Sequence, residues 1–394
     1  MLRLARRLTQ TSAKSYGMFA RAAALGPRPD LIHLELGMPV HDTPEVIKAA
    51  TVAALRAGHV HYSHFQGIPE LRHALAAKMQ TENGLDFTAD EIIVTNGLTE
   101  ASFLAFMALL DEGDEAILLD PYYPQHLGKI EMAGARAVIA PTGPGFTLDK
   151  ALIEARITPR TRVITLVNPS NPTGRCYSRD ELTGVAELAV KHDLAVICDE
   201  VYERITFDGT EHVSIASLPG MRERTITMFA FTKAFAMDGW RIGWLAADKA
   251  LIAPLIKLHA TVVTHVNTFI QHGALAAITA PPEVLAAMVD DDRIKRDLVV
   301  ARLNQMPGVT CALPQGTIYA FPDISATGMP AQALADALLD QAGVVVEAGT
   351  FYGAGGEGHL RICYGSETME RLTEAMDRMT RFFNDLPQPS EARP

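Results

Sequence analysis

The chain has 394 residues, of which 48% are hydrophobic and 21% are charged, and its 35 basic and 46 acidic residues give a net charge of −11. A chain of this size and composition can bury a large core and exceeds one ordinary domain, so we do not expect disorder over most of its length. The acidic balance argues against nucleic acid as a partner, because its phosphates need a basic face.

The N-terminal segment is basic and contains interspersed Ser and Thr. Its basic residues before the first acidic one, Asp30, are Arg3, Arg6, Arg7, Lys14, Arg21 and Arg28. An organellar transit peptide and an exposed arm both fit this pattern, and we favour the arm. No apolar run approaches the roughly 18–20 residues that span a bilayer, so no membrane segment is expected. Four scattered cysteines without a CxxC pair favour a reducing compartment, and we expect a cytoplasmic protein.

Short apolar runs alternate with longer helical patterns through the middle of the chain. The predicted strands are 91–94, 116–119, 162–167, 194–198 and 225–229, and the predicted helices include 99–110 and 178–192. The strand cores are continuous rather than alternating, as in a mostly parallel sheet covered by helices on both faces. This pattern predicts a doubly wound α/β domain over residues 44–280.

A pair of prolines, Pro281 and Pro282, interrupts the alternation of strands and helices. Beyond it, helical patterns flank two stretches, 308–321 and 343–364, that are predicted to be paired strands. We therefore expect a smaller α+β domain over residues 281–394. Residues 1–43 are predicted to form an N-terminal arm and part of that small domain.

Polar and glycine-rich groups follow the carboxyl ends of five predicted strands. They are Asn96-Gly97, Asp120-Pro-Tyr-Tyr123, 168–174, 199–202 and Thr232-Lys233. Because ligands of open α/β sheets bind beyond these strand ends, we expect the groups to meet in one cleft. The cleft would combine a lysine able to form a Schiff base, a carboxylate able to keep a ring nitrogen protonated, and a helix N-terminus able to bind phosphate. Pyridoxal phosphate needs these parts.

Longer blocks of sequence around these groups match known motifs. The run Phe231-Thr-Lys-Ala-Phe-Ala-Met-Asp-Gly-Trp-Arg-Ile-Gly243 resembles the cofactor-lysine signature of the class I/II aminotransferases, and Asn168-Pro-Ser-Asn-Pro-Thr-Gly174 is similar to their NPxNPTG block. Other similar blocks, in the family's order, are 62–67 with 70–72, 95–101, 199–202 and 361–363. The resemblance covers residues 30–383. It implies fold type I, pyridoxal phosphate as cofactor, ping-pong amino transfer, and a homodimer with shared active sites.

The resemblance implies a role for each matching residue near the cofactor ring. Lys233 would form the aldimine with the cofactor and then shuttle the proton between the substrate's Cα and the cofactor's C4′. Asp199 would face the pyridine nitrogen and keep it protonated. Tyr202 and Asn171 would donate hydrogen bonds to the phenolate oxygen, and Tyr123 would stack on the ring.

The same resemblance implies the residues that hold the phosphate and the substrate. The phosphate would be bound by Gly97, Leu98, Thr99, Thr232, Arg241 and the partner subunit's Tyr62. Arg361 would form a two-pronged pair with the substrate's α-carboxylate, which Asn171 and the backbone of Gly37 would also approach. Ala230 stands where many relatives have a phosphate-binding serine, which puts one phosphate contact in doubt.

The substrate is predicted to be a neutral or aromatic amino acid. Aspartate-specific relatives can have a lysine at the position of Thr99, and this chain has none there. Possible walls for an aromatic side chain are Tyr16, Phe19 and Tyr319.

Two other functions remain as alternatives. A carbon–sulfur β-lyase of the same fold is disfavoured because such relatives often have His where Ser170 stands. A transcription regulator with an aminotransferase-like sensor is disfavoured because about 40 residues precede the matching region, too few for a DNA-binding segment.

Two further patterns are interpreted as structural. Residues 353–358 fit the GxGxxG pattern, but they precede a predicted strand, 359–363, instead of joining a strand to a helix. The three histidines His59, His61 and His64 have no Cys or carboxylate partner nearby in sequence, so we expect no metal site there.

Overall fold

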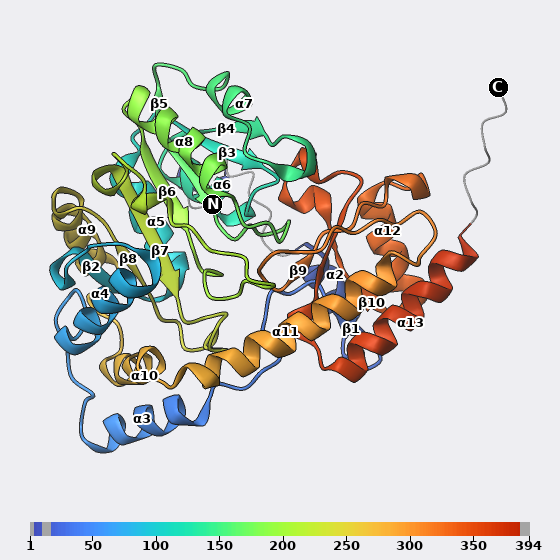
Figure 1. Cartoon of the computed structure of the whole chain (residues 1–394), viewed down its shortest axis with the longest axis horizontal. Coiled ribbons are helices and arrows are strands. Elements are labelled where there is room, and N and C mark those ends of the chain that lie inside the picture. The colour runs from blue at the N-terminus through green and yellow to red at the C-terminus, as the bar shows by residue number, and fades with distance from the viewer. Residues whose placement is uncertain (1–3, 10–16, 387–394) are drawn as a thin grey trace.

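A seven-stranded sheet forms the centre of the larger of two lobes in the computed structural model, which describes residues 4–9 and 17–386 (Figure 1). In spatial order its strands are β2 (Ile92–Thr95), β8 (Gly243–Ala246), β7 (Thr225–Ala230), β6 (Ala195–Asp199), β5 (Thr161–Val167), β3 (Glu115–Asp120) and β4 (Arg136–Pro141). Neighbouring strands pair in parallel except β8, which is antiparallel to both β2 and β7. The predicted mostly parallel, doubly wound sheet is confirmed.

Helices cover both faces of this sheet. They are α4 (Pro69–Asn83), α5 (Gly97–Leu109), α6 (Pro124–Met132), α7 (Lys150–Glu154), α8 (Arg179–Lys191) and α9 (Lys249–Val262). Helix α10 (Thr268–Ile278) packs against α4, and α3 (Glu45–Arg56) packs against α10. Alternate residues of β3 enter different apolar clusters: Ile117 packs in the cluster that contains α8 side chains, and Leu118 packs in the cluster that contains α5 and α9 side chains. Burial on both faces is the reason that the strand sequences are continuously apolar.

Two strands of the sheet, β4 and β8, are absent from the sequence prediction. β4 is the edge strand, and most of its residues are partly exposed, so it lacks the continuous apolar run of its neighbours. β8 has four residues and directly follows the turn-rich segment after Lys233. The strands that were predicted begin and end within about two residues of the observed ones.

The smaller lobe contains two short sheets. β11 (Glu347–Ala348), β12 (Leu360–Cys363) and β9 (Tyr319–Ala320) form an antiparallel sheet, and β1 (Ile32–His33) pairs in parallel with β10 (Val344–Val345). The predicted pairing between stretches 308–321 and 343–364 is thus present as β9 with β12. The helices of this lobe are α2 (Gly17–Ala24), α12 (Ala331–Ala337) and α13 (Met369–Asp385). The expected smaller α+β unit is confirmed, and its boundaries in the sequence stay a prediction.

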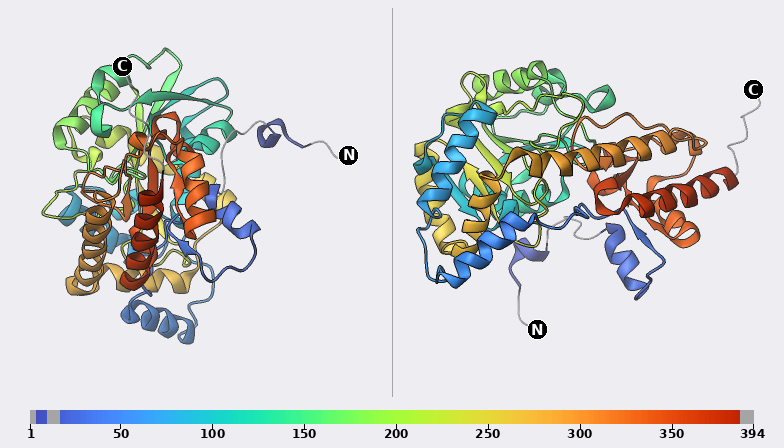
Figure 2. Two further views of the ribbon diagram at one scale, coloured as in Figure 1. Left: turned by 90° about the vertical axis from the view of Figure 1, so that its right-hand side faces the viewer. Right: turned by 60° about the horizontal axis from the view of Figure 1, so that its bottom comes forward.

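The long helix α11 (Pro282–Leu303) runs from the larger lobe into the smaller one (Figures 1 and 2). One apolar cluster also continues through both lobes, since it contains Phe229 of β7 and Trp244 of β8 together with Val345 of β10 and Ile362 of β12. Within the described residues no single helix is long and apolar enough to span a membrane. Only α10 and α11 taken together pass that test, by length and composition, and they are bent by 83° at their break.

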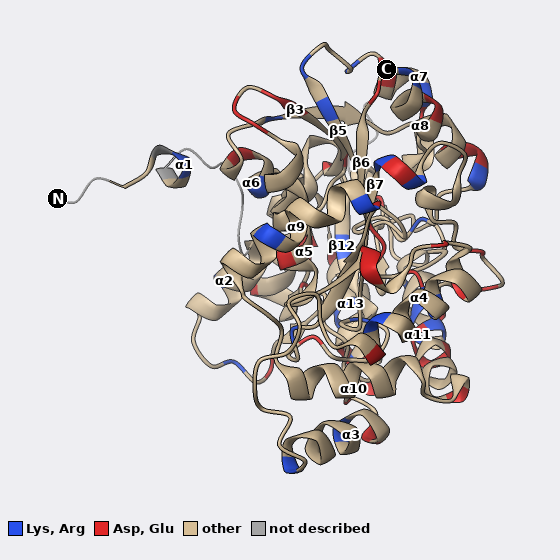
Figure 3. Cartoon of the chain, turned by 90° about the vertical axis from the view of Figure 1, so that its left-hand side faces the viewer, with Lys and Arg blue, Asp and Glu red and all other residues tan. Residues whose placement is uncertain are grey.

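Acidic and basic side chains are interspersed along the helices on the side of the chain shown in Figure 3. Many of them form ion pairs at the surface. Arg222, for example, pairs with Asp86 at 2.8 Å and with Glu91 and Asp248 at 3.0 Å each.

Candidate active site

A cavity of about 270 Å³ lies at the carboxyl ends of the parallel strands, between the two lobes. Eleven of the predicted site residues line it, and these are Gly37, Leu98, Thr99, Tyr123, Asn171, Asp199, Tyr202, Thr232, Lys233, Arg241 and Arg361. The expected convergence of strand ends on one cleft is therefore present. The individual roles of these residues stay predictions.

Asp199 and Lys233 face this cavity from neighbouring strands of the sheet. Asp199 is the last residue of β6, is 7% exposed, and accepts a hydrogen bond of 3.1 Å from the backbone N–H of Val201. Burial raises the pKa of Asp199 to about 6. Lys233 follows β7, and its Nζ donates a hydrogen bond to the carbonyl of Gly37. Burial lowers the pKa of Lys233, and the guanidinium of Arg361 lowers it further.

The N-terminus of α5 lies at one end of the cavity. Gly97 begins this 13-residue helix with φ +72°, and a Cβ there would lie 2.9 Å from Arg241 Nη2. The first N–H groups of a helix have no partner within the helix and attract anions. Leu98, Thr99 and the guanidinium of Arg241 border the same space. Glycine thus lets the Arg241 guanidinium approach the start of α5 closely, at a backbone angle that L side chains rarely adopt.

Arg361 enters the cavity from β12 of the smaller lobe. It is 6% exposed, and its Nη1 donates a 3.2 Å hydrogen bond to Asn171 Oδ1 while its Nη2 donates to the carbonyl of Glu35. Its guanidinium carbon lies 4.3 Å from the ring centre of Tyr319 and 4.9 Å from that of Tyr352. These contacts fix the plane of the guanidinium, as a two-pronged pair with a carboxylate requires.

Two tyrosines join the lobes beside Arg361. The hydroxyls of Tyr202 and Tyr319 lie 2.7 Å apart, and both side chains are buried. A Cβ at Gly37 would overlap Tyr319 Oη and lie 3.0 Å from its Cζ. Gly37 has no positive φ, so glycine is needed at this position because a side chain would overlap Tyr319, and not because of the backbone conformation. Tyr123 packs edge-on against His126, with ring centres 5.2 Å apart.

Four charged or titratable residues near the cavity have no role in the sequence prediction. Glu35, Glu347 and Lys129 line it, and His126 lies beneath it with Nε2 3.9 Å from Asp199 Oδ2. Lys129 donates a 2.7 Å hydrogen bond to Ser102 Oγ, and burial lowers its pKa to about 8. His126 and Lys129 follow Tyr123 at intervals of three residues, and this spacing could have placed both on one helix face with Tyr123.

Several predicted residues lie outside the cavity. Gly97 is adjacent to it, as described above, whereas the Tyr62 side chain is 87% exposed and touches His265 edge-on at 4.8 Å. Of the expected aromatic walls, Phe19 and Tyr319 line the cavity, and Tyr16 lies outside the described residues. Ala230 is the buried last residue of β7.

The GxGxxG stretch and the histidine group have local roles. Gly355 donates its backbone N–H to Asp120 Oδ2 at 2.8 Å, and the stretch leads into β12, so it does not join a strand to a helix as dinucleotide binding requires. That prediction is confirmed. The His59 ring lies 4.2 Å from the ring of His272.

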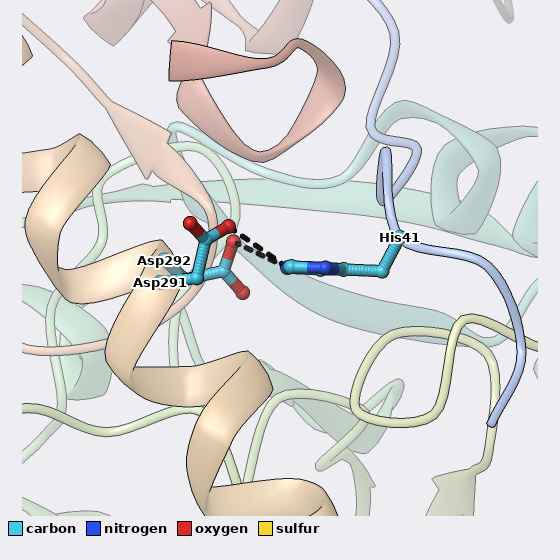
Figure 4. Close-up of side chains that lie close together, drawn as sticks. All are labelled: His41, Asp291 and Asp292. Atoms are coloured by element: carbon cyan, nitrogen blue, oxygen red, sulfur yellow. Dashed lines mark ion pairs between the residues drawn. The ribbon is translucent and has the colours of Figure 1, made fainter.

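A separate cluster joins the chain segment after Gly37 to α11. His41 Nε2 lies 3.1 Å from Asp291 Oδ2 and 3.9 Å from Asp292 Oδ1 (Figure 4). Lys295 Nζ lies 2.6 Å from the same Asp291 oxygen, so an ammonium already balances this carboxylate. Burial raises the pKa of Asp292 to about 7. We interpret the cluster as an ion-pair network rather than a metal site.

Comparison with known families agrees with this geometry. The sequence profile of the family described as "Aminotransferase class I and II" matches residues 29–379. The chain belongs to the class I and II aminotransferases.

Members of this aminotransferase family that are named for different substrates are similar to the chain. The aromatic-amino-acid aminotransferase 2 of Thermococcus litoralis is 37% identical, over 90% of this chain and 92% of that relative. An arginine–pyruvate transaminase of Pseudomonas aeruginosa is 39% identical, over 84% of this chain and 85% of that relative. The solved structure of the Thermus thermophilus aspartate aminotransferase with maleate superposes with a TM-score of 0.90 at 36% identity and covers 97% of this chain and all of that one.

Proposed function

We propose that this aminotransferase binds pyridoxal phosphate on Lys233 and moves an amino group from an L-amino acid to a 2-oxo acid by a ping-pong mechanism. The observation that supports the proposal is the single cavity shared by Lys233, buried Asp199, Arg361 and the start of α5. Amino transfer of this kind requires a lysine amine, a carboxylate for a ring nitrogen, an anion site, and a cation for the substrate's carboxylate.

The cavity residues fit the cofactor at both of its ends. Gly97 lets the Arg241 guanidinium lie close to the N-terminus of α5, and a cation beside the first N–H groups of a helix suits a phosphate. Asp199 is a buried carboxylate that can accept a hydrogen bond from a protonated ring nitrogen. When bound, pyridoxal phosphate supplies a carbonyl for the amino group and a ring that withdraws electrons from the substrate's Cα.

The side chains of this protein would orient the reactants and hold the moving proton. Lys233 suits the transfer of the Cα proton, because burial and neighbouring cations lower its pKa and make a neutral amine accessible. Asn171 Oδ1 accepts from Arg361, which leaves the Asn171 amide N–H groups free to donate to a phenolate oxygen with Tyr202. Tyr123, at the start of α6, would pack on the ring face.

The substrate's α-carboxylate would pair with Arg361, and its side chain would then extend along the neighbouring cavity wall. Aromatic rings of Phe19, Phe351 and Tyr352 form part of this wall, and the carboxylates of Glu35 and Glu347 also line the cavity. Such surroundings do not suit a dicarboxylate as the only substrate. The β-lyase alternative is not favoured, since the similar proteins named above are aminotransferases.

We also propose that the active unit is a homodimer in which Tyr62 reaches the partner's phosphate site. The ring of Tyr62 is 87% exposed, far more than is usual for an aromatic side chain. Other exposed apolar side chains surround it in sequence and on α3, including Val52, Leu55, Val60 and Phe65. An exposed apolar face of this kind is typical of a subunit interface.

Reduction with borohydride tests the cofactor's attachment. The protein loaded with pyridoxal phosphate should give one stable adduct, which peptide mapping should place on Lys233. An L-amino acid should then convert the absorbance of the bound cofactor to that of its amine form, and a 2-oxo acid should restore it. An adduct mapped to Lys129, or release of pyruvate and sulfide from cysteine without amino transfer, would contradict the proposed function.

A further inference from the structure

Two buried carboxylates stand where the donor's side chain would lie. Glu347 is 4% exposed and Glu35 is 2% exposed, and both line the cavity that contains Arg361. We propose that the preferred amino donor is an amino acid with a cationic side chain, a guanidinium or an ammonium, which pairs with Glu347 and Glu35. This inference rests on the proposed amino-transfer function and names its substrate class.

Strand register places Glu347 next to the group that would hold the substrate. Glu347 of β11 is directly opposite Arg361 of β12 in the antiparallel pair. Side chains of directly opposed residues point to the same face of a sheet, with Cβ atoms about 4.5–5.5 Å apart. Glu347 therefore lies beside the group that would bind the substrate's carboxylate, in the cavity that would also receive the substrate's side chain.

The charge balance at the two carboxylates favours a further cation. Glu35 and Glu347 contribute two negative charges when ionised, and the substrate's α-carboxylate adds a third. Lys129, Lys233 and Arg241 line the cavity together with Arg361, but the cofactor and the substrate's carboxylate would engage Lys233, Arg241 and Arg361. Among residues 4–9 and 17–386, no Lys or Arg nitrogen forms an ion pair with Glu347, and Glu35 pairs only with His33, at 2.9 Å. A buried charge without a partner is costly, so a cationic side chain improves this balance and a second carboxylate worsens it.

Free acceptor positions remain on both carboxylates. Glu35 Oε2 is buried and has no hydrogen-bond partner among the described residues. Glu347 accepts from the backbone N–H of Met18 at the start of α2, at 3.1 and 3.3 Å, and so also caps that helix; its Oε1 further accepts from the backbone N–H of Ala348 at 3.2 Å. A carboxylate offers about four acceptor positions, so the helix contact leaves room for a bound guanidinium or ammonium.

The raised pKa values of Glu347 and Glu35 agree with the absence of a cation beside these carboxylates. Burial raises the pKa of Glu347 to about 7 and also raises that of Glu35. The nearby aromatic rings of Phe19, Phe351 and Tyr352 suit the methylene stem and the charged end of a lysine or arginine side chain. The sequence predicts neutral or aromatic donors because no lysine stands at Thr99, whereas the two carboxylates favour a cationic donor.

A donor panel with matched variants tests the inference. The rate of the donor half-reaction is measured with arginine, lysine, leucine, phenylalanine and aspartate on the loaded enzyme. We expect kcat/KM for arginine or lysine to exceed that for leucine by about tenfold or more, as a hydrogen-bonded charge pair allows. Both Glu347→Gln and Glu35→Gln should lower the arginine-to-leucine ratio by about tenfold or more.

The control variant is Glu357→Gln. Glu357 is exposed and accepts from the backbone N–H of Ala331 at the start of α12, so it has a capping contact like that of Glu347 but lies outside the cavity. Its replacement should leave the arginine-to-leucine ratio unchanged. Equal changes for all donors in Glu347→Gln would show that this residue only supports α2.

Binding of unreactive ligands gives a second measurement. Calorimetry of the loaded enzyme should show 5-guanidinopentanoate binding about tenfold or more tightly than hexanoate, with the difference reduced in Glu347→Gln. If leucine or phenylalanine is the better donor and hexanoate binds as tightly, the cationic substrate class is wrong and amino transfer still stands. If no donor changes the absorbance of the bound cofactor, the proposed function itself is wrong.

Discussion

Replacement of Gly37 by alanine tests how closely the backbone that accepts from Lys233 packs against the hydrogen-bonded pair Tyr202 and Tyr319. A Cβ at this position would overlap Tyr319 Oη, and Tyr319 Cζ would lie 3.0 Å away. Protein interiors are close-packed, so either the tyrosine or the backbone has to move by roughly 1 Å. Movement of the backbone displaces the Gly37 carbonyl, which accepts from Lys233.

The magnitude follows from these contacts. Movement of Tyr319 breaks its 2.7 Å hydrogen bond with Tyr202 and leaves a buried hydroxyl unpaired, which costs about 1–3 kcal/mol. Forcing an additional methyl group into a packed site costs about 1–3 kcal/mol. We therefore expect Gly37→Ala to lower the free energy of unfolding by about 2–6 kcal/mol.

Urea unfolding followed by circular dichroism measures this loss, with Tyr319→Phe and the double variant completing a thermodynamic cycle. Removing the hydroxyl leaves Cζ as the nearest atom, so Gly37→Ala should cost at least about 1 kcal/mol less in the Tyr319→Phe background. As a control, Gly239→Ala should change stability by less than about 0.5 kcal/mol, because nothing lies within 4 Å of a Cβ there. Equal costs of Gly37→Ala in both backgrounds would refute the role assigned to the hydroxyl.

Three further predictions concern single ionisable residues. Arg361→Lys should lower kcat/KM for the amino donor by about 30- to 1000-fold in steady-state assays, because an ammonium cannot form the two-pronged carboxylate pair; an unchanged KM and kcat would contradict this role. The pKa of Asp199 is about 6 without cofactor, so its carboxylate is neutral at lower pH, and the affinity for pyridoxal phosphate in fluorescence titrations should fall as pH drops below about 6. This dependence should be absent from Asp199→Asn. The pKa of Asp292 is raised from 3.8 to about 7, so the folded protein binds the proton of this carboxyl more tightly than the unfolded chain does. Protonation of Asp292 therefore contributes its full stabilisation below about pH 4, and this stabilisation is lost as the pH rises through 7. Between about pH 5 and 8 the urea midpoint of wild type should therefore fall relative to that of Asp292→Asn, and parallel profiles would argue against the shifted pKa.

The sequence predicts the centre of the site well because the fold imposes simple geometry on it. Asp199 and Lys233 follow successive buried strands, and parallel strands end at one edge of a sheet, so the two side chains had to lie close together. Arg361 was located through its motif rather than through geometry.

Other features depend on packing that the sequence does not display. The position of Glu347 beside Arg361 depends on the register between β11 and β12, two strands of two and four residues that carry little periodic signal. The burial of Lys129 depends on how α6 packs against α5, where Ser102 accepts its hydrogen bond. Strand β4 was missed because an edge strand is only partly apolar.

The length of α11, the helix that both lobes share, determines how far a small rotation displaces the smaller lobe. At 1.5 Å per residue the 22 residues of α11 form a rod about 33 Å long. A turn of only about 5° at its first residues displaces its far end by about 3 Å, which is roughly the length of one hydrogen bond. Since Arg361 belongs to the lobe at that far end, a rotation of α11 by a few degrees would be enough to form or break its hydrogen bonds with a carboxylate.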